Sequence, residues 1–205
     1  MRSSPVLLRD DRGNRLTPEP WRWHEPSSPG EHRLLARLQA PVLDVGCGPG
    51  RAVEALARQG AIALGLDPAP SAAALARSKG RAVLQRSVFD PLPGHGRWAT
   101  VLLLDGNIGI GGDPVRLLHR CAALLDPDGV IVAEVERPGS AWRRCRARLE
   151  AGPEVGPWFP WAVVGCDAVG WLASVSGLRV QAVEQIEDGR WAASLVVERE
   201  RHACA

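Results

Sequence analysis

Residues 42–51 combine one acid with three evenly spaced glycines, in the sequence VLDVGCGPGR. Glycines at 46, 48 and 50 allow a tight turn and let the backbone approach a ligand without Cβ clashes. The apolar residues before this turn predict a buried strand, and residues 52–58 after it predict a helix. Free N–H groups at the start of a helix attract polar or anionic ligand atoms. The segment therefore predicts a nucleotide-type cofactor site at the end of a strand.

The glycine spacing discriminates between two kinds of cofactor. A dinucleotide-binding fingerprint, G-x-G-x-x-G, needs glycine at the position held here by Arg51. The observed spacing is G-x-G-x-G with Asp44 two residues before it, which resembles motif I of the class I S-adenosylmethionine (SAM)-dependent methyltransferases. The resemblance extends over about residues 30–137 and implies SAM as the cofactor. A nicotinamide-dependent oxidoreductase and a plain strand–helix turn are the alternatives.

A second acid, Asp67, follows the apolar run at residues 61–66 and lies about 20 residues after Gly46, as ribose-binding acids do in nucleotide folds. The resemblance implies that Asp67 contacts the cofactor ribose and that Pro68 also contacts the cofactor. A carboxylate can accept hydrogen bonds from both ribose hydroxyls. The alternative is an aspartate that only caps the helix after it.

The expected adenine contact departs from the family pattern. Related sequences often place an acid after the third strand to receive the adenine amino group, but Ser87 stands at that position here. A serine oxygen still accepts a hydrogen bond, without charge, and Val88 or Phe89 would then pack on the ring. Asp90 would replace Ser87 if the register shifts.

Asp105 and Asn107 follow an apolar run at residues 100–104, where methyltransferases commonly present the reacting methyl group. Methyl transfer is an in-line displacement, so the protein mainly positions two groups and excludes water; a general base helps for a hydroxyl acceptor. We expect Asp105 to act as a base or to orient the acceptor and Asn107 to orient it, although both are ordinary turn residues. The cofactor contacts implied by the resemblance are Asp44, Gly46, Cys47, Gly48, Gly50, Asp67, Pro68, Ser87, Val88, Phe89, Leu104 and Asp105.

Two segments are expected to approach the acceptor. Residues 1–30 lack periodicity and predict an irregular arm or cap, whose Trp21, Trp23 and His24 either cover the cofactor or anchor the arm. The rest, residues 31–205, predicts one domain with a substrate lid at about 138–165. Aromatic residues in the lid predict a partly apolar pocket wall or the core of the lid; they are Trp142, Trp158, Phe159 and Trp161.

Other polar residues carry weaker predictions. An arginine run, at 143, 144, 146 and 148, predicts a solvated helix face or a contact with an acidic group. Glu134 and Glu136 alternate along an expected strand, so one should point inward. His95 is expected on a surface loop, and His119 should be partly buried in a helix.

Apolar runs that alternate with helical patterns predict a parallel sheet covered on both faces. From the resemblance we expect a three-layer αβα sandwich, with a seven-stranded, mostly parallel sheet that ends in an antiparallel hairpin. Helices are predicted at 31–39, 52–58, 71–78 (with Ser71 as a possible N-cap), 114–125, 141–150 and 166–176. Strands are predicted at 41–45, 61–66, 82–85, 100–104, 130–135, 178–186 and 191–197, with turns at 126–129 and 187–190.

Composition limits the possible classes. A chain of 205 residues with a net charge of +2 fits one globular domain and makes nucleic acid an unlikely partner. Five cysteines without a C-x-x-C pair predict free thiols in the cytoplasm, and no metal site. The apolar run at residues 6–8 is too short for a signal peptide, and no stretch is long enough to span a membrane.

We therefore expect a SAM-dependent methyltransferase that acts on oxygen or nitrogen of a small, partly apolar molecule. An RNA or protein methyltransferase is an alternative, although the Asp105–Ile108 loop lacks the N-P-P-Y-like motif of such enzymes. A catalytically inactive SAM-binding regulatory module is the other alternative. The oligomeric state stays open.

Overall fold

The computed structural model describes residues 6–16 and 20–198, without the side chains of Pro20 and Trp21; Cys204 also lies outside the described residues. Its main sheet has the strand order β10-β11-β6-β5-β2-β3-β4. The sheet is mostly parallel, but β11 pairs antiparallel with both β6 and β10, so the expected terminal hairpin is confirmed. The seven strands are β2 (Val42–Val45), β3 (Ala63–Leu66), β4 (Val83–Leu84), β5 (Trp98–Leu103), β6 (Leu125–Val135), β10 (Leu178–Glu187) and β11 (Arg190–Val197).

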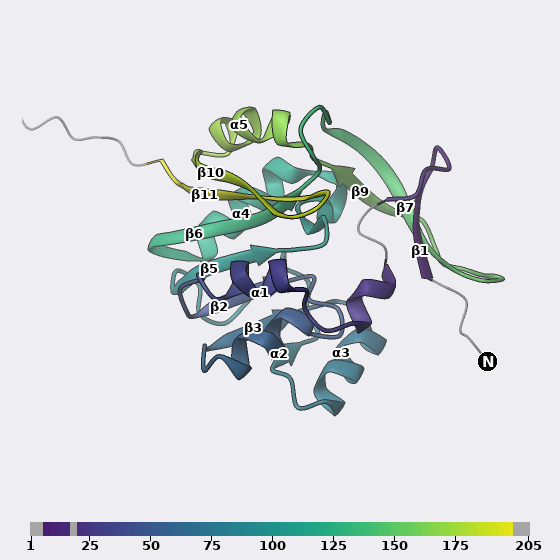
Figure 1. Cartoon of the computed structure of the whole chain (residues 1–205), viewed down its shortest axis with the longest axis horizontal. Helices are drawn as coiled ribbons and strands as arrows, with labels where there is room; N and C mark the ends of the chain where they lie inside the picture. Colours follow the sequence, from purple (N-terminus) through teal and green to yellow (C-terminus); the bar gives the residue numbers. More distant parts are fainter. Residues whose placement is uncertain (1–5, 17–19, 199–205) are drawn as a thin grey trace, which may run out of the picture.

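Helices cover both faces of this sheet, which confirms the three-layer αβα architecture (Figure 1). Residues of α1 and α2 pack on one face, and residues of α4 and α5 pack on the other. α3 packs beside α2 through Val53 and Ala73 near the β4 edge. The helices are α1 (Pro29–Leu35), α2 (Arg51–Arg58), α3 (Pro70–Ser78), α4 (Pro114–Leu124) and α5 (Cys166–Val175), with 3-10 segments η1 (Pro20–His24) and η2 (Asn107–Gly112). None of the described helices is long and apolar enough to cross a membrane.

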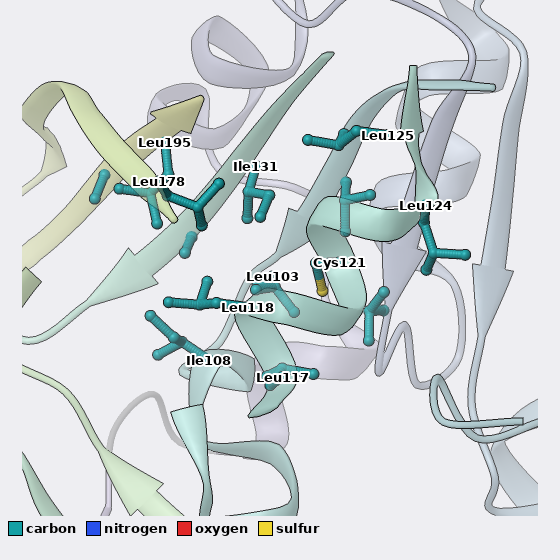
Figure 2. Close-up of a cluster of buried hydrophobic side chains, with 14 of the residues drawn as sticks. Leu103, Ile108, Leu117, Leu118, Cys121, Leu124, Leu125, Ile131, Leu178 and Leu195 are labelled. Carbon is teal, nitrogen blue, oxygen red and sulfur yellow. The ribbon is translucent and has the colours of Figure 1, made fainter. Parts of the chain in front are cut away.

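The largest apolar core lies between the sheet and the α4–α5 layer. Figure 2 shows Leu118 and Cys121 of α4 directed toward Leu103 of β5 and Ile131 of β6. All four side chains are fully buried. The same strands direct their alternate residues toward α1 and α2, so both faces are apolar. Because both faces of these strands are buried, their sequences are continuous apolar runs and do not alternate with polar residues.

A second, smaller sheet corrects two expectations. Residues 141–150 form no helix; most of them belong to β7 (Arg143–Ala151), which pairs antiparallel with β1 (Val6–Asp10) and β9 (Phe159–Val163). The arm is therefore not wholly irregular, because β1 is a strand. Partners distant in sequence supply the backbone hydrogen bonds of β7, and this overrides its local preference for helix. β8 (Glu154–Val155) completes the sheet.

Two local predictions were also wrong. Ser71 is not the N-cap of α3, because Ala69 holds that position and Pro70 follows at the first turn. Residues 126–129 fall within β6, and the register with β5 shifts across them, since Leu125 pairs with Trp98 and Val130 with Thr100. The aspartate-rich segment is therefore an irregular stretch within β6 and not a turn that precedes the strand.

The start of α4 offers a stability test. Asp113 is its N-cap, and its side chain accepts a hydrogen bond from the backbone N–H of Arg116 at 3.1 Å. Asp113→Ala should lower the free energy of unfolding by about 1 kcal/mol, because a helix-end donor loses its partner. Asp113→Asn keeps an acceptor oxygen and should retain most of the stability. Urea unfolding of the three proteins measures this; equal losses in both variants would contradict a capping role.

Candidate active site

The glycine turn after β2 is held by backbone and side-chain hydrogen bonds. Gly46 and Cys47 donate their N–H groups to the carbonyl of Leu66 at 2.8 and 3.0 Å. The side-chain amide of Asn107 donates to the carbonyls of Val45 and Gly46, both at 2.9 Å. A Cβ on Gly46, whose φ is +73°, would lie 2.7 Å from that amide. The turn therefore depends on glycine at this position and on Asn107, which braces it.

Gly48 and Gly50 have different surroundings, although both have positive φ. A Cβ on Gly48 would meet nothing within 4 Å, whereas one on Gly50 would lie 3.0 Å from Arg81. Gly50 is the N-cap residue of α2, with a φ of +81°. Gly48 thus leaves open space beside the turn, and Gly50 shapes the start of the helix.

A cavity of about 840 Å³ opens beside this turn. It runs from the carboxyl ends of β2, β3 and β5 to the small sheet and to η1. Its volume lies within the range of about 300–1,000 Å³ usual for small-molecule sites. Gly50 is absent from its lining, but all the other expected cofactor residues line it: Asp44, Gly46, Cys47, Gly48, Asp67, Pro68, Ser87, Val88, Phe89, Leu104 and Asp105.

Asp67 lines the cavity and does not cap α3, whose N-cap is Ala69. Its Oδ1 accepts from the N–H of Ala69 at 2.8 Å, and its Oδ2 accepts from the N–H of Gly48 at 2.9 Å. Burial raises the pKa of Asp67, while these two hydrogen bonds oppose the shift. Each carboxylate oxygen has a second lone pair, so Asp67 can still accept from a ligand.

Asp44 is a buried carboxylate at the end of β2, only 3% exposed. Within the described residues no hydrogen bond or ion pair to its side chain was found, although Asp105, Arg51, Asp67 and Glu31 lie near enough to influence it. Burial, with a further contribution from Asp105, raises the pKa of Asp44 to about 7. A buried carboxylate without a partner favours a cationic ligand group beside it.

In the loop after β4, hydrogen bonds fix the positions of Ser87 and Phe89. Ser87 Oγ accepts from the N–H of Phe89 at 3.2 Å, and Asp90 Oδ2 accepts from the N–H of Ser87 at 3.0 Å. Asp90 is exposed and does not line the cavity, so the shifted register with Asp90 at the site finds no support. Arg116 stacks on the Phe89 ring, 4.3 Å from its centroid.

Asp105 and Asn107 both line the cavity, but each also has protein partners. Arg51 Nη2 donates to Asp105 Oδ2 at 2.7 Å. Both hydrogen bonds of the Asn107 amide nitrogen go to the glycine turn, which leaves its Oδ1 for a ligand. Burial raises the pKa of Asp105, against the effect of Arg51. The roles of the two residues toward an acceptor stay predictions.

The far end of the cavity is apolar and comes from the two segments expected to approach the acceptor. Trp23 and His24 of η1, Leu8 of β1, and Phe159 and Trp161 of β9 all line it. The Phe159 and Trp161 rings meet edge to face, with centroids 5.9 Å apart. Trp142 and Trp158 lie elsewhere: Trp142 stacks on Trp171, and Trp158 lies under Arg148.

The remaining polar residues lie away from the cavity. In the arginine run, Arg143 pairs with Asp10 and Arg148 with Glu150, on a strand and not on a helix face. Arg144 and Arg146 are exposed. His95 is exposed, as expected, but His119 is exposed too, which corrects the expectation of partial burial.

A second cavity of about 420 Å³ adjoins the first, and Trp161 lines both. Gly106, Glu134, Arg190 and Arg137 also line the second cavity. Glu134 is 4% exposed and Glu136 is half-buried, and both line this cavity. The expectation that they point to opposite sides was therefore wrong, because residues two apart on a strand share a face. Arg190 had no signal in the sequence, because it reaches the site from the far end of the chain.

Comparison with known proteins agrees with this geometry. Residues 42–129 match the family model described as a methyltransferase domain. The ubiquinone biosynthesis O-methyltransferase of Salmonella paratyphi A is 35% identical over 108 residues, which cover 49% of this chain and 45% of that protein. The protein of the same name from Klebsiella pneumoniae strain 342 gives the same identity and coverage. The match thus spans less than half the length of these curated relatives.

Solved structures share the fold over more of the chain. A SAM-dependent methyltransferase from Bacteroides fragilis, in complex with S-adenosyl-L-homocysteine, has a TM-score of 0.81 at 20% identity and covers 97% of this chain and 90% of its own. The 1,6-didemethyltoxoflavin-N1-methyltransferase of Burkholderia thailandensis has a TM-score of 0.58 at 20% identity and covers 82% and 75%. At these identities the likeness establishes the fold.

Proposed function

We propose that this chain is a class I SAM-dependent methyltransferase, which transfers a methyl group from SAM to oxygen or nitrogen of a small molecule; the match of residues 42–129 to the methyltransferase-domain model and the shared fold support this. The observation that carries the proposal is the glycine turn with Asp44 and Asp67 on one cavity at the carboxyl ends of the parallel strands. Ligands of open α/β sheets bind at this edge. The named relatives include an O-methyltransferase and an N1-methyltransferase, so the proposal includes both oxygen and nitrogen as the methylated atom.

The residues present fit SAM. Open space at Gly48 admits a ligand against the backbone, and Asp67 offers lone pairs to ribose hydroxyls. The unpartnered Asp44 suits a cationic group, and SAM has both an ammonium and a sulfonium. Val88 and Phe89 offer an apolar surface to the adenine. When bound, SAM supplies an electrophilic methyl group.

The protein's own contribution is then positioning and exclusion of water. Asn107 fixes the glycine turn and presents Oδ1 to the cavity. Asp105 is held beside Leu104, where we expect it to contact the cofactor and to orient the acceptor or accept its proton. Phe159 and Trp161 shield the far end of the cavity with apolar surface. We propose that the acceptor places an apolar, planar portion against these two rings.

The acceptor class can be tested with labelled cofactor. SAM carrying a tritiated methyl group would be incubated with the protein and a panel of small aromatic alcohols and amines. Transfer of label to any of them, lost in a Trp161→Ala variant that still binds S-adenosylhomocysteine (SAH), supports the proposal. SAH binding without transfer across the panel would favour a regulatory binding module.

Asp44 predicts a pH dependence of cofactor affinity. Its pKa of about 7 in the free protein means that it is protonated below neutral pH. A cationic ligand group favours the charged form, so SAM affinity should fall as pH drops from 8 to 6, by up to about 10-fold per pH unit below the pKa. Titration calorimetry at several pH values measures this.

The matched variant is Asp44→Asn, which should bind SAM more weakly at pH 8 and show a flatter pH profile. The sign for stability is opposite: an acid whose pKa is raised by folding stabilises the free protein below its unfolded pKa, and that contribution is lost as pH rises toward 7. A wild-type affinity that is constant between pH 6 and 8 would contradict the role given to Asp44.

A further inference from the structure

Two arginines and two carboxylates form a closed ring of ion pairs behind the loop that follows β5. Arg51 Nη2 donates to Asp105 Oδ2 at 2.7 Å, and Arg190 Nη2 lies 3.3 Å from Asp105 Oδ1. Glu31 closes the ring, because it accepts from Arg51 and, at 2.7 Å, from Arg190 Nη1. Each charge therefore touches two opposite charges. The four residues come from α1, α2, the β5–η2 loop and β11.

The side chains of this ring are largely buried. The side chain of Glu31 is 1% exposed, and those of Arg51 and Arg190 are 8% and 6% exposed. Burial alone would raise the pKa of Glu31, but the two arginines lower it below its ordinary value, so Glu31 is charged. Buried ion pairs of this kind are often no more stabilising than apolar residues of similar size. A role other than stability is therefore worth seeking.

Asp105 has the conformation that gives the ring such a role. Its φ is +55°, and no other non-glycine residue in the described segments has a positive φ. Most L-residues disfavour this region, although aspartate tolerates it in turns; at Asp105 three contacts also hold the residue there. The N–H of Asp105 donates to Glu134 Oε2 at 2.8 Å. Arg190 in turn donates two hydrogen bonds to the Glu134 carboxylate, from Nε at 2.7 Å and from Nη2 at 2.6 Å.

Asp105 is thus fixed at its backbone and at both carboxylate oxygens, and Arg190 contributes to two of these three points. Members of the ring line both cavities. Arg51 and Asp105 line the larger cavity, whereas Arg190 and Glu134 line the smaller one. Glu31 lines neither. Arg190 and Glu31 therefore reach the larger cavity only through Arg51 and Asp105.

We propose that Arg190 and Glu31 are positioning residues of the methyl-transfer site, which hold Asp105 in its left-handed conformation against the cofactor. This inference rests on the proposed function. The C-terminal hairpin then controls cofactor affinity, although it lies about 140 residues after the glycine turn in the chain.

The test compares SAH affinity, by titration calorimetry, with the thermal midpoint in three variants. Arg190→Gln should bind SAH about 10-fold more weakly and melt at a lower temperature, because Asp105 loses two supports and four carboxylates, those of Asp105, Glu31, Glu134 and Glu187, lose a partner. Adding Glu31→Gln removes the charge of one carboxylate that lost Arg190, so the double variant should regain part of the midpoint. It should not regain SAH affinity, since Asp105 still lacks Arg190.

Thr100→Val is the control for stability alone. Thr100 is fully buried near the opposite end of β5, where its hydroxyl donates to the carbonyl of Gln39 at 2.8 Å. This variant should melt lower and bind SAH as the wild type does. If Arg190→Gln fails to fold, Arg190→Lys replaces it, because an ammonium keeps the charge but cannot bridge Glu31, Glu134 and Asp105 together.

The outcomes separate this inference from the proposed function. Affinity that stays low while the midpoint recovers supports positioning. Affinity that recovers with the midpoint, or that never changes in Arg190→Gln or Arg190→Lys, overturns it and leaves a structural ring. A wild-type protein that binds no SAH would overturn the proposed function, and the inference with it.

Discussion

The Gly48→Val variant is expected to lose measurable affinity for SAM and SAH while the protein stays folded. A side chain at this position meets no protein atom within 4 Å, so it would project into the cavity where the cofactor is proposed to lie. The backbone φ of +53° adds strain of roughly 1–2 kcal/mol for an L-residue. Loss of binding should exceed 100-fold, and titration calorimetry measures it.

Gly60→Val is the matched control for backbone strain. Gly60 has a φ of +79°, also with open space around it, and follows the C-terminus of α2 away from the cavity. Both variants should lose similar stability, but only Gly48→Val should lose SAH binding. Equal affinity in the two variants, with circular dichroism showing intact folds, would mean that the cofactor lies elsewhere.

The Asp67→Ala variant is expected to weaken SAM and SAH binding by about 1–3 kcal/mol, the usual contribution of hydrogen bonds to a charged group. The carboxylate is proposed to accept from the ribose hydroxyls. It also fixes the N–H groups of Gly48 and Ala69, so part of the loss would come from a looser glycine turn.

A comparison of nucleosides separates these two contributions. Adenosine and 2′,3′-dideoxyadenosine differ in the hydroxyls that Asp67 is proposed to bind. Wild-type protein should favour adenosine, and Asp67→Ala should bind both compounds equally. Asp67→Asn keeps one acceptor oxygen and should fall between the two proteins. A preference for adenosine that survives in Asp67→Ala would contradict ribose binding by this residue.

The glycine turn and Asp67 could be predicted from the sequence because their chemistry is local. Positive φ at Gly46 and Gly48 and the carboxylate at the end of β3 follow from neighbours within a few residues. Gly50 shows the limit of this reasoning. Its spacing fits the motif, but it serves the start of α2 and does not line the cavity.

Long-range pairing explains what the sequence could not show. Residues 141–150 have a helical composition, yet β7 forms there because β1 and β9 supply its partners. The aromatic residues of the lid predicted an apolar end of the cavity. Only the fold shows that Phe159 and Trp161 line the cavity and that Trp142 and Trp158 do not.

The ion-pair ring also depends on contacts between residues far apart in the sequence, so the sequence could not predict it. A capping box joins Ser28 and Glu31, and the S-x-x-E pattern could have located it. Nothing in the sequence connects that glutamate with Arg190, because the two meet only after the hairpin docks beside β6. Asp105 was predicted as a substrate-facing residue, whereas its supports became visible only in three dimensions.

The central claim is that the cavity beside the glycine turn binds SAM. Titration calorimetry of the wild-type protein with SAM, SAH and NAD in parallel, at pH 8, tests it most directly. The account predicts saturable binding of SAM and SAH at one site and no binding of NAD. Binding of NAD, or the absence of binding by both adenosyl ligands, would contradict it.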